Sequence, residues 1–146
     1  MINRFSLILA FVACGIVQSY AADPGSPHAP IPGVSTKILL KTTKAWNGQT
    51  LPPYGAGPAE VTIMKYEFEP GASIPVHMHP VVNGGVLLSG ELTIRTTTGQ
   101  TITIKPGDAV VETFKQWHSG ANTGSVKAEL IMFYAGHPGV PLVIRK

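Results

Sequence analysis

The sequence predicts an all-β protein with one barrel or sandwich domain, and three observations lead to that prediction. Short runs rich in β-branched and aromatic residues recur from Val34 onward, and Gly/Pro turns separate them at near-regular spacing. No window of ten or more residues has the apolar periodicity of an amphipathic helix. At 146 residues the chain has room for one domain and is too short for two comfortable ones.

The first 21 residues are expected to be a signal peptide, because a positive charge precedes the apolar run "FSLILAFVACGIV", which is too short to span a bilayer. Ser19 and Ala21 supply the small residues of a cleavage site, so we place the cut after Ala21. A lipoprotein acylated at Cys14, the only cysteine, ranks second, since Phe11 fits poorly at the aliphatic position before it. We therefore expect a periplasmic or secreted protein without stable membrane insertion after cleavage.

Residues 22–33, "ADPGSPHAPIPG", are rich in proline and glycine and are expected to form a flexible lead-in to a barrel domain over 34–146. The formal net charge is +3, and the lysines are scattered without a dense run. Nucleic-acid binding needs a concentrated basic patch. The charge therefore indicates a mildly basic solvated surface and no nucleic-acid partner.

The first expected strand is 35–43, "STKILLKTT", and the loop 47–58 follows it with three prolines and three glycines. Long loops of this kind in compact domains are often lids or binding loops. The segment 59–69, "AEVTIMKYEFE", predicts a long strand closed by the turn Pro70-Gly71. The next expected strands are 74–79 and 85–89.

Apolar and polar residues alternate across 91–98, and Gly99-Gln100 predicts a hairpin turn into a strand at 101–105. The turn Pro106-Gly107-Asp108 then leads into 109–114, "AVVETF". The remaining expected strands are 118–124, 128–135 and 140–145.

Two of the five histidines, His77 and His79, lie one residue apart within the expected strand 74–79. Side chains at i and i+2 of a strand point to the same face, so both imidazoles reach into the same space. That arrangement suits a metal ion, whereas a single histidine would more often be an ordinary half-buried strand residue. His28 and His137 have no such neighbour and are expected to be exposed.

The spacing of these residues resembles the two signature motifs of the cupin superfamily. The first motif is a glycine, five residues, His-x-His, three or four residues, a glutamate, six residues and a glycine. The second is a glycine, five residues, Pro-x-Gly, two residues, a histidine, three residues and an asparagine. The resemblance runs over residues 59–134 and matches Gly71, His77, His79, Gly90, His118 and Asn122.

The resemblance implies a single-domain β-barrel of the jelly-roll type with a metal held inside by His77, His79 and His118. Three neutral imidazoles suit a divalent Fe, Mn, Ni, Cu or Zn ion. The resemblance also implies a homodimer formed through the outer sheet or the N-terminal strand, for which "TKILLK" (36–41) is a candidate.

The sequence departs from the motifs at two places. Asn83 stands at the glutamate position, and Thr113-Phe114-Lys115 replaces Pro-x-Gly, so a lysine occupies the turn glycine's place. Without a carboxylate a three-histidine centre keeps its full +2 charge and is more Lewis acidic. Glu112 offers a replacement as ligand or general base if it turns inward, and faces solvent near the barrel mouth otherwise. Alternation does not decide between these orientations.

We name Glu112 and Asn83 as candidate catalytic residues. Trp46 and Tyr54 are candidate substrate-binding residues that would cover the barrel opening, although core packing is the commoner role for each. The expected function is an exported metalloenzyme with dioxygenase-, isomerase- or decarboxylase-type chemistry on a small organic substrate. A non-catalytic metal- or small-molecule-binding module is the alternative, and a metal-free structural or sugar-binding barrel ranks last.

Overall fold

The structure, a computed structural model, describes residues 33–146. The expected signal peptide, Cys14 and almost all of the lead-in 22–33 therefore lie outside the described residues. Every regular element between 33 and 146 is a β-strand, which confirms the prediction of an all-β protein. Across this part of the chain, no helix is long and apolar enough to cross a membrane. Residues 38–146 form one compact unit.

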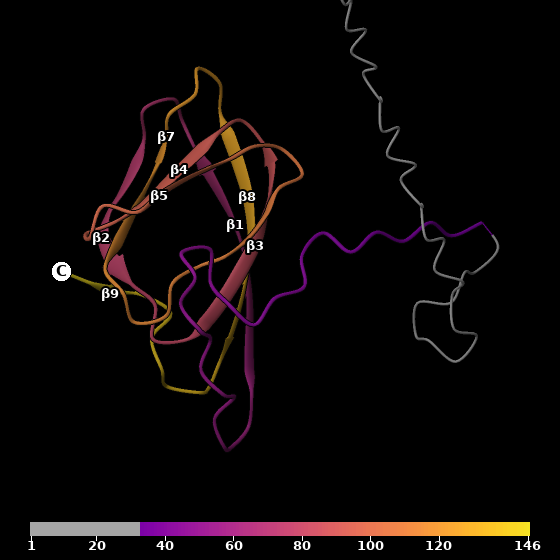
Figure 1. Ribbon diagram of the computed structural model, residues 1–146, viewed down its shortest axis with the longest axis vertical. Coiled ribbons are helices and arrows are strands. Elements are labelled where there is room, and N and C mark those ends of the chain that lie inside the picture. The colour runs from indigo at the N-terminus through magenta and orange to yellow at the C-terminus, as the bar shows by residue number, and fades with distance from the viewer. Residues whose placement is uncertain (1–32) are drawn as a thin grey trace, which may run out of the picture. The chain divides into compact units, whose positions relative to one another are not determined.

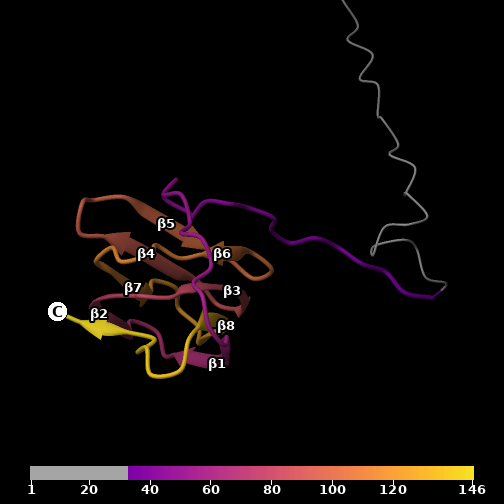
Figure 2. The same cartoon turned by 90° about the horizontal axis from the view of Figure 1, so that it is seen from below.

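The strands form two sheets with antiparallel pairing (Figure 1). The four-stranded sheet has the order β1 (Glu60–Phe68), β8 (Ala128–Gly136), β3 (Val82–Ser89) and β6 (Ala109–Val111). The five-stranded sheet has the order β5 (Thr101–Ile104), β4 (Leu92–Thr96), β7 (His118–Asn122), β2 (Ser73–Met78) and β9 (Ile144–Arg145). Figure 2 shows β5, β4, β7 and β2 in one layer and β6, β3, β8 and β1 in the other.

The core lies between the two layers and is built by strict alternation along the strands. In β8 every second residue, Leu130, Met132 and Tyr134 among them, is buried between the sheets. Leu92 and Ile94 of β4 meet them from the opposite sheet in the same core cluster. Consecutive strands lie in different sheets, except for β4 and β5, as in a jelly roll.

Several expected strands come out shorter than predicted, and one does not form. No strand forms over 35–43, and Ile38, Leu39 and Leu40 are exposed, because a strand needs a partner and this segment has none among the described residues. The expected strand 140–145 shrinks to the two residues of β9, and 109–114 ends at Val111. The chain leaves β6 there because the following residues turn toward the barrel interior.

Strand β2 contains a register shift that positions the first histidine. Ser73 and Ile74 pair with Ala121 and Gly120 of β7, but His77 pairs with His118, one residue out of that register. The extra residue falls at Pro75-Val76, where proline is tolerated because a bulge needs no ladder hydrogen bond. Continuing the first register would place Val76 opposite His118 instead. The bulge thus turns His77 from the outer face to the barrel interior.

Asn122 ties three parts of the barrel together at the far end of β7. Its buried amide nitrogen donates to the carbonyls of Phe68 at 3.0 Å and Val126 at 2.8 Å. Its amide oxygen accepts from the backbone N–H of Gly124 at 2.9 Å. One side chain therefore satisfies buried backbone groups at the end of β1 and in the turn before β8, where water has little access.

Replacing Asn122 with alanine should destabilise the barrel by about 2–4 kcal/mol, because two carbonyls and one N–H lose their partner in a buried place. Urea unfolding followed by tryptophan fluorescence measures the loss. Asn47→Ala is the matched control, since Asn47 also accepts a backbone N–H two residues on, but in a more accessible loop. A loss no larger than that of the control would contradict the assignment.

Candidate metal centre

Three buried histidines from different parts of the five-stranded sheet converge inside the barrel. His77 and His118 lie opposite each other on β2 and β7, and His79 follows directly after β2. One ring nitrogen from each lies within 4.8 Å of the others. The ring centroids are 4.4–5.1 Å apart. The predicted convergence of His77, His79 and His118 is thus present in the fold.

The opposite nitrogen of each ring is fixed by a backbone carbonyl. Nδ1 of His77 donates to Pro75 at 2.8 Å, and Nδ1 of His79 donates to Leu142 at 2.8 Å. Nδ1 of His118 donates to Gln116 at 2.9 Å. Because a carbonyl only accepts, each Nδ1 carries a proton in these bonds, and each neutral ring keeps the lone pair on Nε2. This is how metal-binding histidines are oriented in proteins.

The free nitrogens fit a metal ion better than any partner that the chain supplies. Nε2 of His118 is buried and has no hydrogen-bond partner, and Nε2 of His79 is buried with only the Glu112 carboxylate beside it, at 2.8 Å. A neutral His79 with its proton on Nδ1 would turn a lone pair toward that carboxylate, so the pair needs either a proton or a metal ion between them. Buried polar atoms without a partner are rare, because each costs about 1–3 kcal/mol. A divalent transition metal, which binds imidazole at about 2.0–2.1 Å, would satisfy both. The residues present therefore fit the group.

Glu112 is turned inward, which was one of the two orientations left open by the sequence. It is only 12% exposed, and its Oε2 lies 2.8 Å from Nε2 of His79. Its Oε1 lies 3.8 Å from Nε2 of His118. Because Val110 of β6 is buried, alternation beyond the strand directs Glu112 to the same interior. The carboxylate lies at the edge of the histidine cluster and not within its common set of ligand distances.

Burial and the ionic contact shift the pKa values of His79 and Glu112 in opposite directions. Burial alone lowers the pKa of His79, but the contact with the Glu112 carboxylate outweighs burial and the pKa is raised. Burial alone raises the pKa of Glu112, but the contact with His79 and the charges of the three histidines lower it below its ordinary value. For His77 burial dominates and lowers the pKa. A buried carboxylate of this kind needs a cation beside it.

The turn that precedes β7 is hydrogen-bonded to the loop at residues 44–50. The Gln49 amide donates to the Phe114 carbonyl at 2.8 Å and accepts from the Phe114 N–H at 2.9 Å. The N–H of Lys115 donates to the carbonyl of His79 at 2.8 Å. Thr113, which is buried, places its hydroxyl 3.1 Å from Nδ1 of His118. The bond from Lys115 holds His79 through its backbone carbonyl, and the Thr113 hydroxyl holds His118 through Nδ1.

Asn83, at the position where the motif has glutamate, is buried on β3. Neither its amide nitrogen nor its amide oxygen has a hydrogen-bond partner. Its backbone carbonyl accepts from the N–H of Glu112 at 3.2 Å, so the two residues named as catalytic candidates are neighbours. Asn83 is not among the residues that line the cavity described below, so its catalytic role stays a prediction without a supporting contact.

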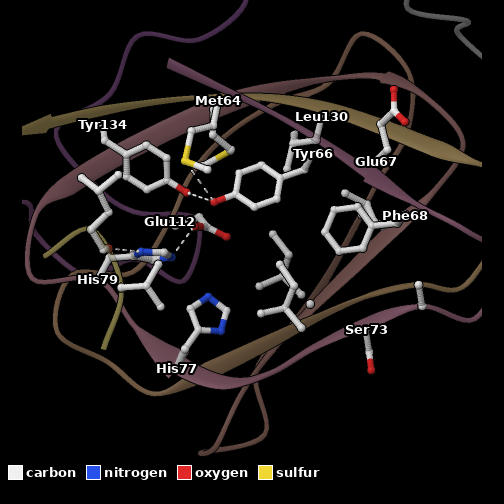
Figure 3. A pocket seen from close by; sticks show the side chains of 18 of the residues that line it. Met64, Tyr66, Glu67, Phe68, Ser73, His77, His79, Glu112, Leu130 and Tyr134 are labelled. Atoms are coloured by element: carbon white, nitrogen blue, oxygen red, sulfur yellow. Dashed lines mark hydrogen bonds and ion pairs between the residues drawn. The ribbon is translucent and has the colours of Figure 1, made fainter. Parts of the chain in front are cut away.

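A cavity of about 550 Å³ opens beside the histidines, within the range of small-molecule sites. Figure 3 shows His77, His79 and Glu112 at one end of it. Two tyrosines, Tyr66 and Tyr134, are among its lining residues. Their hydroxyls are 2.9 Å apart. Alternation places both residues inward. The β1–β8 register pairs Tyr66 with Leu130 and Tyr134 with Thr62, so the hydroxyls meet because the two long side chains point toward each other along neighbouring strands.

Trp46 and Tyr54 are not among the residues that line this cavity. Tyr54 is 85% exposed, and Trp46 packs against the core, with its backbone N–H donating to the carbonyl of Val111 in β6. Their proposed role in substrate binding therefore stays a prediction without a supporting contact. His137 binds the carbonyl of Pro58 at 3.0 Å, away from the histidine cluster.

Replacing any one of His77, His79 or His118 with alanine should weaken metal affinity by more than about 100-fold, since even the loss of an outer partner of a ligand costs about 10–100-fold. Elemental analysis and competition with a chelator measure the change. His137→Ala is the matched control and should retain the metal of the parent chain. Equal metal content in all four variants would rule out the centre.

Lys115 has φ of 52°, the one left-handed non-glycine residue between 33 and 146, at the place of the motif's turn glycine. A non-glycine L-residue in this conformation costs about 1–2 kcal/mol. Replacing it with glycine removes that strain, but glycine loses more backbone entropy on folding, which offsets about half of the gain. Lys115→Gly should thus stabilise the fold by about 0.5–1 kcal/mol in urea unfolding. Lys105→Gly, at an exposed position without positive φ, should destabilise it instead. The opposite signs would identify backbone strain.

The family model of the cupin domain matches residues 64–134. No protein with a curated description matches the chain. Three similar solved structures share the fold. A Klebsiella pneumoniae protein with a double-stranded beta-helix domain is 24% identical, with a TM-score of 0.50, over 58% of this chain and 76% of its own. A polyketide cyclase from Streptomyces resistomycificus is 19% identical, with a TM-score of 0.50, over 58% and 59%.

The third structure, a DMSP lyase from Ruegeria pomeroyi, is 17% identical, with a TM-score of 0.51, over 59% of this chain and 43% of its own. At these identities the likeness concerns the fold alone, and the matched parts are only fractions of the longer chains. The double-stranded beta-helix domain of the Klebsiella pneumoniae protein agrees with the two sheets described above. Together with the family model, it shows that the chain belongs to the cupin superfamily.

Proposed function

We propose that this chain is an exported metalloenzyme in which His77, His79 and His118 hold one divalent transition metal next to a substrate cavity. The observation that carries the proposal is the set of three Nδ1–carbonyl bonds, which leaves three Nε2 lone pairs converging on one place. The fold hosts enzymes of different chemistries, so it does not select a reaction. Dioxygenation, isomerisation and decarboxylation of a small organic substrate remain the candidate reactions.

A divalent ion at this place supplies a Lewis acid that polarises an oxygen of substrate or water. The chain's own residues provide the rest. Glu112, 2.8 Å from the ring of His79, accepts a proton from a substrate group that enters the cavity, or serves as a further ligand. Asn83 lies beside Glu112 with an unpaired amide, but it does not line the cavity, so its part in the proposal rests on this neighbouring position alone. The apolar walls of the cavity exclude water from this end.

One observation favours the alternative of a non-catalytic metal-binding module. Glu112 is near enough to two of the histidines to become a fourth protein ligand. Zinc sites with four protein ligands are closed and structural, whereas catalytic sites keep an open position. The number of exchangeable positions on the metal therefore distinguishes the enzyme from the module.

Export and the homodimer stay proposals. The signal peptide lies outside the described residues, and the segment 36–41 makes no strand pairing within the described part of the chain. The exposed apolar residues Ile38, Leu39 and Leu40 are what supports a role of this segment in self-association. Size-exclusion chromatography with light scattering on the mature chain, with and without residues 36–41, tests the dimer.

The Co²⁺-substituted protein tests the enzyme proposal, because its visible absorption reports the ligands of the metal. Added azide should shift the spectrum if a position is open. Glu112→Gln should keep the azide response and weaken metal affinity by about 10–100-fold, because it removes the negative charge beside His79. Glu91→Gln, a surface carboxylate away from the cavity, is the control. A spectrum that never responds to azide would favour the module.

A further inference from the structure

The cavity beside the histidines is divided into a polar end and an apolar end. His77, His79 and Glu112 gather at one end in Figure 3, and Phe68 lies at the other. Glu67 and Ser73 also border the Phe68 end, but both are exposed, on the outward-facing positions of β1 and β2. Between them the walls are mostly apolar side chains of both sheets, such as Ile74, Leu92 and Leu130. A molecule that fills this space therefore needs an apolar body and a polar group at the end that faces the histidines.

Gly120 leaves the wall open at the middle of β7. It lines the cavity on the same strand face as His118, and a Cβ built at this position would meet nothing within 4 Å. Its φ is not in the left-handed region, so the backbone does not require glycine there. Gly85 of β3 differs, since a Cβ there would lie 2.3 Å from Met132 Sδ. The absence of a side chain at Gly120 therefore leaves space in the cavity, and the backbone conformation does not require glycine there.

The volume of the cavity fits a molecule larger than one ring. It holds about 550 Å³, whereas a cavity of about 150 Å³ is enough to enclose benzene. Gly120 is flanked in the sheet by Ile74 of β2 and Ile94 of β4, and both line the cavity. We call the row Ile74, Gly120 and Ile94 the glycine strip. A planar ligand lying on this strip would contact the two isoleucine side chains and pass over the glycine.

The tyrosine pair supplies hydrogen bonds at the polar end. Tyr66 and Tyr134 share one hydrogen bond of 2.9 Å, in which one hydroxyl donates and the other accepts. The Tyr66 hydroxyl also donates to Sδ of Met64 at 3.6 Å, so Tyr66 is the accepting member when that contact forms. A thioether sulfur is only a weak acceptor, so an oxygen that enters the cavity can take this proton instead. The ring of Tyr134 is 5.7 Å from that of His79, and Figure 3 shows the paired hydroxyls next to Glu112. A hydroxyl donor and a carboxylate acceptor thus face the same end of the cavity.

We propose that the cavity binds a phenol or enol with an apolar body of about two rings, that Gly120 provides the room for this body, and that the Tyr66–Tyr134 pair holds its hydroxyl oxygen beside the histidines. This inference rests on the proposed function and names the substrate class of the same site. A hydroxyl is the group that both donates to Glu112 and accepts from a tyrosine. A carboxylate would only accept and would meet a second carboxylate in Glu112.

Naphthol, naphthalene and naphthoic acid are the probes, titrated calorimetrically into the mature chain in its metal-free and Zn²⁺-loaded forms. Naphthol should bind at least about tenfold more tightly than naphthalene, because the hydroxyl forms hydrogen bonds in a buried place. Naphthoic acid should bind more weakly than naphthol. Equal affinity for naphthol and naphthalene, or tighter binding of naphthoic acid, would overturn the assignment of the substrate's polar group.

Gly120→Val tests the room for the apolar body. A valine at this position should weaken naphthol binding by about tenfold or more, because it fills the strip that the body needs. The metal affinity should stay that of the parent, since the substitution leaves every histidine in place. Ser119→Val is the matched control: it adds bulk to the same strand on the opposite face and should bind naphthol as the parent does. Equal naphthol affinity in both variants would overturn the role of Gly120.

Tyr66→Phe tests the tyrosine pair separately. It removes one hydroxyl and keeps the ring, so the preference for naphthol over naphthalene should fall by several-fold while naphthalene binding is unchanged. An unaltered preference would remove the pair from the proposal. The metal-free titrations separate this inference from the proposed function: a chain that takes up no metal but binds naphthol refutes only the enzyme, and a metal-loaded chain that binds no probe refutes only the substrate class.

Discussion

The convergence of the three histidines depends on a single extra residue in β2. Up to Ile74 the strand keeps one register with β7, and at His77 it has moved by one residue, which sets His77 opposite His118. Since side chains alternate between the two faces of a sheet, an unshifted strand would direct His77 outward and leave the interior to Val76 and Met78. Pro75 lies within the shift, and its carbonyl is also the group that orients the ring of His77.

The motif positions divide into those that form the centre and those that hold the barrel closed. Gly90 belongs to the second kind: its φ is +74°, and a Cβ there would lie 2.6 Å from Cα of Ala128, so only glycine fits. Asn122 belongs to it as well, through its bonds to backbone groups of two other segments. The motif's carboxylate has no equivalent at Asn83, but Glu112, which follows β6, brings a negative charge to the same interior.

The sequence could place these groups only in part. The spacing of His77 and His79 was enough to expect a shared face, and the second motif named His118 as their partner. The inward turn of Glu112 could not be predicted, since apolar residues occupy both faces of the segment around it. Tyr66 and Tyr134 lie on inward positions of strands far apart in the chain, and their contact depends on both the pairing of β1 with β8 and the direction of two long side chains that start four residues out of register. Composition indicated aromatic lid residues in Trp46 and Tyr54, which do not line the cavity.

The sequence by itself determined the all-β class, the position of most turns and the identity of the three histidines, because strand alternation, Gly/Pro turns and motif spacing are local properties of the chain. The tertiary structure alone decided that the segment 35–43 forms no strand, that Glu112 faces His79, and that a gap at Gly120 opens the cavity wall. Each of these depends on which distant segment lies opposite. A strand, an ion pair and an empty space all need a partner surface, and that surface exists only once the two sheets have closed on each other.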